Sequence, residues 1–164
     1  MPAYAPEEVP LLFAEALSAG DLEALMPLYE AQAILLAQPG EAPAKGTEEI
    51  RAALQGFLAT EPMFTIQVRR VFEADDLALS FADWNLTGAG PDGEAVEMSG
   101  QTSDVLRRQP DGTWRFVIDN PFVAHTVSEV RGRLAPFWAA GRILLVAGPI
   151  RPYTEGSGPG LCAQ

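Results

Sequence analysis

Three residue types that supply much of protein chemistry are nearly missing from this sequence of 164 residues, which has one cysteine, one histidine and one lysine. A single cysteine, Cys162, excludes an internal disulfide framework and a metal site built from cysteines. A single histidine, His125, excludes a site built from several histidines and leaves a Ser-His-Asp triad only one candidate base. We therefore expect no metal and no cofactor, and we interpret His125 and Cys162 as residues without a chemical role.

Positive charge is also scarce. The sequence has 11 basic residues against 22 acidic residues, which gives a formal net charge of −11. This balance argues against nucleic acid and anionic membranes as partners, because cationic surfaces bind both. The acidic excess lies in residues 1–121, with 20 acidic and 7 basic residues, whereas residues 122–164 have 2 acidic and 4 basic residues. The charge thus separates an acidic domain from a weakly basic extension.

The sequence has no recognisable targeting signal and no convincing membrane-spanning run. Its most apolar stretch, residues 134–150, contains Arg142, two prolines and two glycines, which argues against a transmembrane helix. Hydrophobic residues make up 48% of the chain, so wholesale disorder is excluded and the length suits one domain with a core. We expect a cytoplasmic protein.

The first third of the chain predicts three helices. Apolar residues recur at helical spacing in residues 6–19, and Gly20 can end that helix while Asp21 caps a second one over residues 22–29. Thr47 can cap a third helix, which would end near residue 61. Residues 33–37 form a short apolar run of strand length.

After residue 62 the pattern changes to alternation, which predicts four strands. We expect them over residues 64–72, 77–86, 94–109 and 113–120, with a bulge at Gly100 in the third. Three helices followed by an antiparallel meander predict an α+β fold with the helices on one face of a curved sheet. Such a sheet would leave a pocket between its strands and the helices.

Three segments carry a resemblance to a known family. They are residues 13–25 (FAEALSAGDLEAL), residues 46–54 (GTEEIRAAL) and residues 104–121, which contain the hairpin QPDGTW. Together they resemble the SnoaL-like group of the nuclear transport factor 2-like superfamily, over about residues 6–122. The resemblance implies a cone-shaped α+β fold that commonly dimerises through its sheet. The superfamily contains enzymes and non-catalytic binding and assembly domains, so the fold does not decide the function.

Two enzyme types of the superfamily fit the sequence poorly. Steroid isomerases use an Asp base and an oxyanion hole made of a Tyr and a protonated Asp. By the resemblance these positions fall on Ala37, Phe13 and Asp104, so only the last can serve. Limonene-epoxide-hydrolase-like members need an Arg and an Asp two residues apart. Here Arg115 and Asp119 are four apart, which leaves an Asp-Arg-Asp cluster with Asp104 as an open alternative.

Asp104 is the main candidate for chemistry, as acid, base or ligand anchor. Without a bulge, Met98, Gly100, Thr102 and Asp104 share one face of a strand, and the resemblance directs that face toward the pocket. A carboxyl among apolar neighbours should have a raised pKa. The alternative is a structural Asp that hydrogen-bonds to the sheet or to a partner subunit.

Other candidates for the pocket wall remain open between a structural and a ligand-binding role. Asp83 and Trp84 lie on opposite faces of one strand, and either face could be the pocket face. Asp119 shares a face with Val117 in a regular strand, or else makes the turn before Pro121. The full set of candidate ligand-binding residues is Phe13, Tyr29, Asp83, Trp84, Met98, Thr102, Val117 and Asp119.

We expect residues 1–122 to form the SnoaL-like domain and residues 123–164 to form a C-terminal extension. In the extension, Thr126 and Glu129 match a capping box before a helical apolar stripe that includes Phe137 and Trp138. Exposed, this stripe would promote aggregation, so we expect it to pack on its own domain or on a dimer partner.

These observations predict a protein that binds a small apolar organic molecule in the pocket and forms a homodimer through the sheet. Two alternatives remain. One is an enzyme, of the isomerase, cyclase, dehydratase or hydrolase type, that uses Asp104 as acid or base. The other is an assembly module whose pocket is filled by its own side chains.

Deleting residues 126–164 should lower the free energy of unfolding or the dimer fraction, because the extension would no longer cover apolar surface. Urea unfolding and sedimentation velocity measure the two quantities. A truncated protein as stable and as dimeric as the full chain would contradict the packing of the extension.

Overall fold

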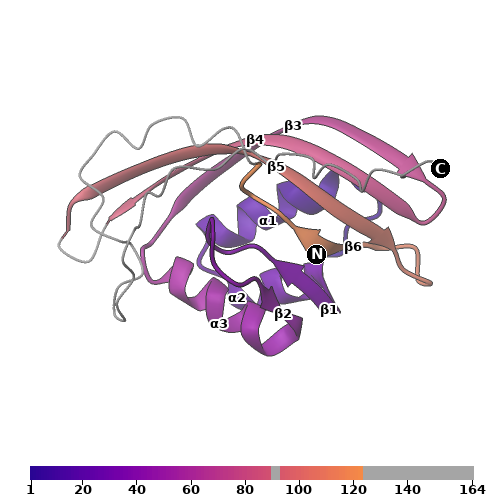
Figure 1. Ribbon diagram of the computed structural model, residues 1–164, viewed down its shortest axis with the longest axis horizontal. Coiled ribbons are helices and arrows are strands. Elements are labelled where there is room, and N and C mark those ends of the chain that lie inside the picture. The colour runs from indigo at the N-terminus through magenta and orange to yellow at the C-terminus, as the bar shows by residue number, and fades with distance from the viewer. Residues whose placement is uncertain (90–92, 124–164) are drawn as a thin grey trace, which may run out of the picture.

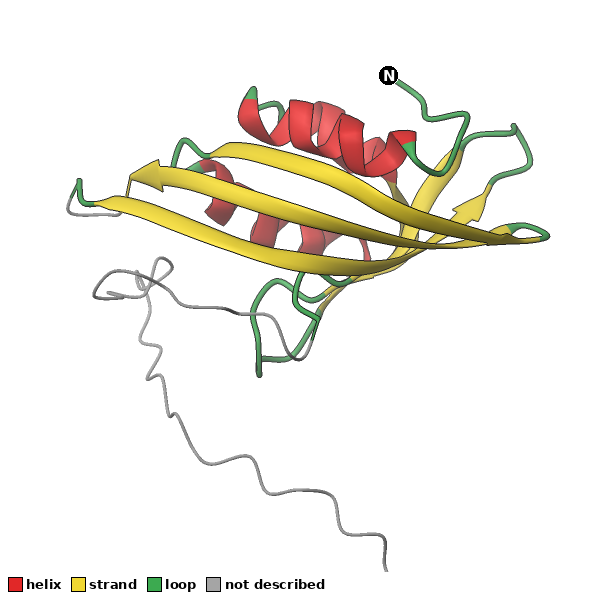
Figure 2. Cartoon of the chain, turned by 90° about the horizontal axis from the view of Figure 1, so that it is seen from above, coloured by secondary structure: helices red, strands yellow, loops and turns green. Residues whose placement is uncertain are grey.

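The computed structural model describes residues 1–89 and 93–123, and the predicted C-terminal extension beyond residue 123 lies outside the described residues. The long strands arch over the helices, which all lie beneath the concave side of the sheet (Figure 1). Figure 2 shows the same two layers from above. The predicted α+β fold with a curved sheet is therefore confirmed.

The elements are α1 (Glu8–Ser18), α2 (Leu22–Leu25), the 3-10 helix η1 (Met26–Leu28), β1 (Tyr29–Leu35), β2 (Ala44–Lys45), α3 (Gly46–Leu58), β3 (Met63–Ala74), β4 (Leu77–Ala89), β5 (Ala95–Arg108) and β6 (Trp114–Asp119).

The helical layer follows the prediction with two differences. Thr47 does not cap the third helix, because α3 already begins at Gly46 and Thr47 lies within its first turn. Gly20 adopts a positive φ of 71° after α1, and the Asp21 carboxylate accepts a hydrogen bond of 2.9 Å from the Ala24 amide at the start of α2. The second helix ends at Leu25, however, and Tyr29 begins a strand. Pro27 lacks the amide needed to continue the helix, so the chain passes through the 3-10 turn η1 instead.

The sheet has six strands in the order β2-β1-β6-β5-β4-β3. The predicted meander forms its antiparallel part, from β3 to β6. The prediction missed that β1 runs parallel to β6, with Tyr29 beside Phe116 and Leu35 beside Asp119. This parallel pairing covers the edge of β6, which would otherwise present unpaired backbone groups.

Bulges occur at positions other than the predicted one. The pairing of β4 with β5 is unbroken through Gly100, so the bulge predicted there is wrong. The pairing of β3 with β4 shifts between Val68 and Arg70, and this shift sends Phe72 to the outer face, where it is 53% exposed. A second shift lies in β6, which has one extra residue, Val117, opposite β5.

The core lies between the arch and the helices. It includes fully buried side chains from α1, α3 and β5, among them Val9, Ile50, Leu54 and Leu106. None of the helices in the described part of the chain is long and apolar enough to cross a membrane.

Candidate functional site

A cavity of about 70 Å³ lies between the concave face of the sheet and helices α1 and α3. This volume suits a small organic group or a few water molecules. Side chains from both layers line it, and most of them are apolar. They are Pro10, Phe13, Leu17, Leu35, Leu54, Phe57, Phe64, Ile66, Trp84, Leu86, Met98, Thr102, Asp104, Phe116, Asp119, Pro121 and Phe122.

Aromatic rings form much of the cavity wall and contact one another. Phe13 makes edge-on contacts with Phe64 and Phe116, at centroid distances of 5.8 and 6.0 Å. The ring of Phe64 stacks on the indole of Trp84 at 5.8 Å, and Phe122 contacts the same indole edge-on. Each ring therefore restrains its neighbours, which favours a preformed cavity.

Asp104 is held by two hydrogen bonds at the wall of this cavity. The Thr102 hydroxyl donates to its Oδ2 at 2.7 Å, and the Asn120 amide donates to its Oδ1 at 3.0 Å. The residue is only 2% exposed. The alternation of β5 brings Met98, Thr102 and Asp104 to the concave face, as predicted for an unbulged strand. Both carboxyl oxygens are thus fixed in position.

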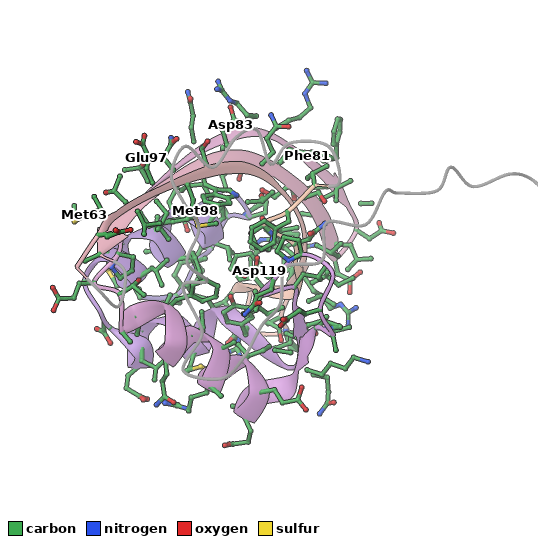
Figure 3. The ribbon with its side chains drawn as sticks, turned by 60° about the vertical axis from the view of Figure 1, so that its left-hand side comes forward. Met63, Phe81, Asp83, Glu97, Met98 and Asp119 are labelled. Carbon is green, nitrogen blue, oxygen red and sulfur yellow. The ribbon has the colours of Figure 1, made fainter. Side chains whose placement is uncertain are left out.

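Asp119 is the second carboxyl in the cavity wall. It ends β6, and the hydroxyl of Tyr29, at the start of β1, donates to its Oδ2 over 2.5 Å. Tyr29 is itself buried and lies behind Asp119, outside the set of residues that line the cavity. Figure 3 shows Asp119 and Met98 under the arch of the sheet. The parallel pairing of β1 with β6 is what places Tyr29 and Asp119 together.

Burial changes the acidity of all three groups. It raises the pKa of Asp119 to about 6, although the hydrogen bond from Tyr29 acts in the opposite direction. Burial, together with the negative charge of Asp119, holds the pKa of Asp104 well above its ordinary value. Burial and the neighbouring Asp119 raise the pKa of Tyr29. Both buried carboxyls therefore bind a proton more readily than a solvent-exposed aspartate does.

The two carboxyls thus form a proton-holding pair inside an apolar cavity. Either carboxyl can donate a hydrogen bond when protonated and accept one when ionised, and burial favours the protonated form of both. Titratable groups with shifted pKa values are typical of functional sites. In the described part of the chain, no cluster of three or more His, Cys, Asp or Glu side chains could hold a metal ion.

The structure brings together most of the residues predicted for the pocket wall. The cavity is lined by six of them: Phe13, Trp84, Met98, Thr102, Asp104 and Asp119. The two alternatives left open for β4 are resolved as well, since Trp84 faces the cavity and Asp83 faces outward (Figure 3). Whether these residues bind a ligand stays a prediction.

Asp83 and Val117 lie outside the cavity. The Asp83 carboxylate accepts a hydrogen bond of 2.7 Å from Arg69 Nε and one of 2.9 Å from Gln101 Nε2, all on the outer face of the sheet. Val117 is the extra residue of the β6 bulge, so the alternation predicted for this strand fails there. Phe116 and Asp119 face inward instead.

The Asp-Arg-Asp cluster that the sequence left open, with Arg115 between the two aspartates, does not form. Asp104 and Asp119 both reach the cavity, but Arg115 lines a separate surface groove beside Met1 and Asp111. The sequence reasoning also missed Phe122, which follows the last strand. Its amide donates to the side-chain oxygen of Asn120, a local turn that no periodicity reveals.

Comparison with known proteins agrees with this architecture. The sequence matches the SnoaL-like domain family over residues 12–120, which is about two thirds of the chain, and the protein therefore belongs to this family. No curated protein matches the sequence.

Solved structures with the same fold share little sequence with this chain. A ketosteroid isomerase-like protein from Erwinia carotovora atroseptica is 19% identical, with a TM-score of 0.62 over 69% of this chain and 88% of that one. A proposed dehydratase of the NTF2-like family from Streptomyces avermitilis is 24% identical, with a TM-score of 0.60 over 69% of this chain and 89% of that one. An NTF2-like protein with a cystatin-like fold from Novosphingobium aromaticivorans is 22% identical, with a TM-score of 0.61 over 76% of this chain and 82% of that one. At these identities the likeness shows the fold alone.

The raised pKa of Asp119 should make the protein less stable as the pH rises from 4 to 6. The folded state keeps this proton up to about pH 6, whereas an unfolded Asp releases it near pH 3.9, so the contribution of Asp119 to stability is greatest below about pH 4. The loss across this window is roughly 3 kcal/mol. Asp119→Asn should reduce it, as measured by urea unfolding at a series of pH values.

Asp83→Asn is the matched control for this measurement. Arg69 and Gln101 lower the pKa of Asp83, so its contribution to stability disappears only on acidification below the ordinary range. The fall between pH 4 and 6 should persist in this variant. An Asp119→Asn protein with the same pH dependence as the wild type would contradict the assignment.

Proposed function

We propose that the cavity binds a small, mainly apolar organic molecule that carries one polar group. The observation that supports this most directly is the pair of carboxyls, Asp104 and Asp119, in a wall that is otherwise apolar and aromatic. Apolar surface drives entry of the ligand, and a few fixed polar groups set its orientation. A carbonyl or hydroxyl oxygen of the ligand would accept a hydrogen bond from protonated Asp104.

The same pair favours a second candidate function, which is proton transfer on the bound molecule. Ionised Asp119 is available as a general base and protonated Asp104 as the hydrogen-bond donor to an oxygen that gains negative charge. A ketone would lose a proton from the carbon next to its carbonyl to Asp119, and the enolate oxygen would be stabilised by Asp104. Asp119 would return a proton to the carbon in the reverse step, after exchange of its own proton with solvent, so no co-reactant other than water is needed.

Proteins of the same fold offer limited support for chemistry at this cavity. The structures similar to this chain include one described as ketosteroid isomerase-like and one as a proposed dehydratase. Both reaction types move a proton next to a carbonyl or hydroxyl group. The low identities leave the substrate of this chain open.

Acetophenone, a small aromatic ketone, tests both functions. The wild type should bind it, and Asp104→Asn should weaken binding about tenfold, because the amide is a weaker donor than the acid in this position. Ligand-observed NMR measures the affinity. In D₂O, the wild type should also speed deuterium exchange of the methyl protons of the ketone, and Asp119→Asn should abolish this effect.

Asp83→Asn, on the outer face, serves as the control and should change neither quantity. A wild type that does not bind acetophenone would contradict the binding function. Binding without faster exchange than in buffer would contradict only the proton-transfer function.

We further propose that the outer face of the sheet pairs with a second copy of the chain. An outer patch, formed by Phe72, Leu77, Leu79 and Phe81, lies there, and the guanidinium of Arg70 lies over the ring of Phe72 at 5.7 Å. Leu77 and Leu79 are each 38% exposed, and Figure 3 shows Phe81 on the convex side. Apolar side chains gathered on one face favour association, and the resemblance to sheet-paired dimers points to a self-complementary interface.

Leu79→Glu should reduce the dimer fraction, because it places a charge in the centre of the proposed interface. Sedimentation velocity at several concentrations measures this fraction. Leu11→Glu, on α1, is the matched control at 44% exposure and should leave the fraction unchanged. A monomeric wild type, or a dimeric Leu79→Glu variant, would contradict this interface.

A further inference from the structure

Gly100 occupies a position in β5 where the backbone does not require glycine. The pairing of β4 with β5 continues in regular register on both sides of it, and Gly100 itself pairs with Trp84. Its φ is outside the left-handed region, in contrast to Gly93 and Gly112. Glycine in the interior of a strand weakens the strand, so a space requirement is the remaining physical reason.

The indole of Trp84 needs the space that a side chain at position 100 would fill. A Cβ atom at position 100 would lie 2.7 Å from Cζ2 of Trp84 and 2.8 Å from Cε2, well inside normal contact distance. Gly100 lies on the concave face between Met98 and Thr102, which both line the cavity. The indole therefore lies over β5, in the space that a side chain at position 100 would take.

Three contacts hold the indole in this position. Its Nε1 donates a hydrogen bond of 2.8 Å to the carbonyl of Pro121, its face stacks on Phe64, and Phe122 contacts it edge-on. Pro121, Phe64 and Phe122 all line the cavity. A displacement away from β5 would push the indole into the cavity and stretch the hydrogen bond to Pro121.

We propose that Gly100 determines which ligands the cavity accepts, by allowing Trp84 to lie flat against β5 and so setting the depth of the cavity. This inference rests on the proposed binding function. A residue with a side chain at position 100 makes the cavity shallower, and a smaller ring at position 84 makes it deeper. Gly100 acts through Trp84 and touches no ligand itself, so the two positions are energetically coupled.

The test is a double-mutant cycle with Gly100→Ala, Trp84→Phe and the double variant. The probes are acetophenone, 4-methylacetophenone and 4-propylacetophenone, with affinities measured by ligand-observed NMR. Relative to the wild type, Gly100→Ala should weaken binding of the 4-propyl compound at least about tenfold more than that of acetophenone. Trp84→Phe should shift the preference toward the longer compound.

Phenylalanine lacks the atom Cζ2, which an added Cβ at position 100 would approach most closely, so Trp84→Phe relieves the shortest of these contacts. In the Trp84→Phe background, Gly100→Ala should therefore change all affinities by less than about twofold. Gly56→Ala is the control for the glycine replacement, since an added Cβ there meets no atom within 4 Å. It should leave the profile of affinities unchanged.

The outcomes separate this inference from the function on which it rests. If the wild type binds none of the ketones, the binding function fails and the inference fails with it. If the wild type binds the ketones and Gly100→Ala has the same relative affinities for the three of them, only the inference fails. If Gly100→Ala does not fold, recovery of folding and binding in the double variant supports it, and an unfolded double variant overturns it.

Discussion

The parallel pairing of β1 with β6 is the constraint on which the rest of the structure depends. β1 continues directly from the short helices α2 and η1, and β6 is the last strand of the antiparallel meander. Their pairing joins the helical layer to the arch and closes one edge of the meander. It also fixes Tyr29 against Asp119, so a backbone arrangement determines the environment of a carboxyl.

The cavity wall combines groups that are costly to bury with contacts that offset the cost. A buried carboxyl without partners is strongly unfavourable, and here each carboxyl has hydrogen-bond donors from neighbouring segments. Aromatic rings that contact one another surround the two carboxyls, which are only 2% and 6% exposed, and this burial raises both pKa values. Burial of Asp104 and Asp119 therefore carries a cost in stability, which their hydrogen bonds offset in part.

Much of the fold and part of the site could be predicted from the sequence. Alternation along β5 placed Met98, Thr102 and Asp104 correctly, because that strand has no bulge. Alternation failed for Val117, because the extra residue of β6 reverses which side chains face inward. Gly100 was read as a bulge, since a strand glycine has two explanations and only the position of the Trp84 indole distinguishes them. Contacts between residues far apart in sequence, such as Tyr29 with Asp119, leave no periodic signal.

The irregularity near Arg69 divides β3 into two parts in which the alternation of inward and outward side chains has opposite phase. Before it, Phe64 and Ile66 face the cavity, and after it Phe72 faces outward. Val71, in the second half, packs against the core, whereas Thr65 and Gln67, in the first half, lie on the outer face. Removing this one residue would restore strict alternation and exchange the two faces along half the strand. The inserted residue thus sets which side chains of the second half of β3 face the core, with Val71 inward and Phe72 outward.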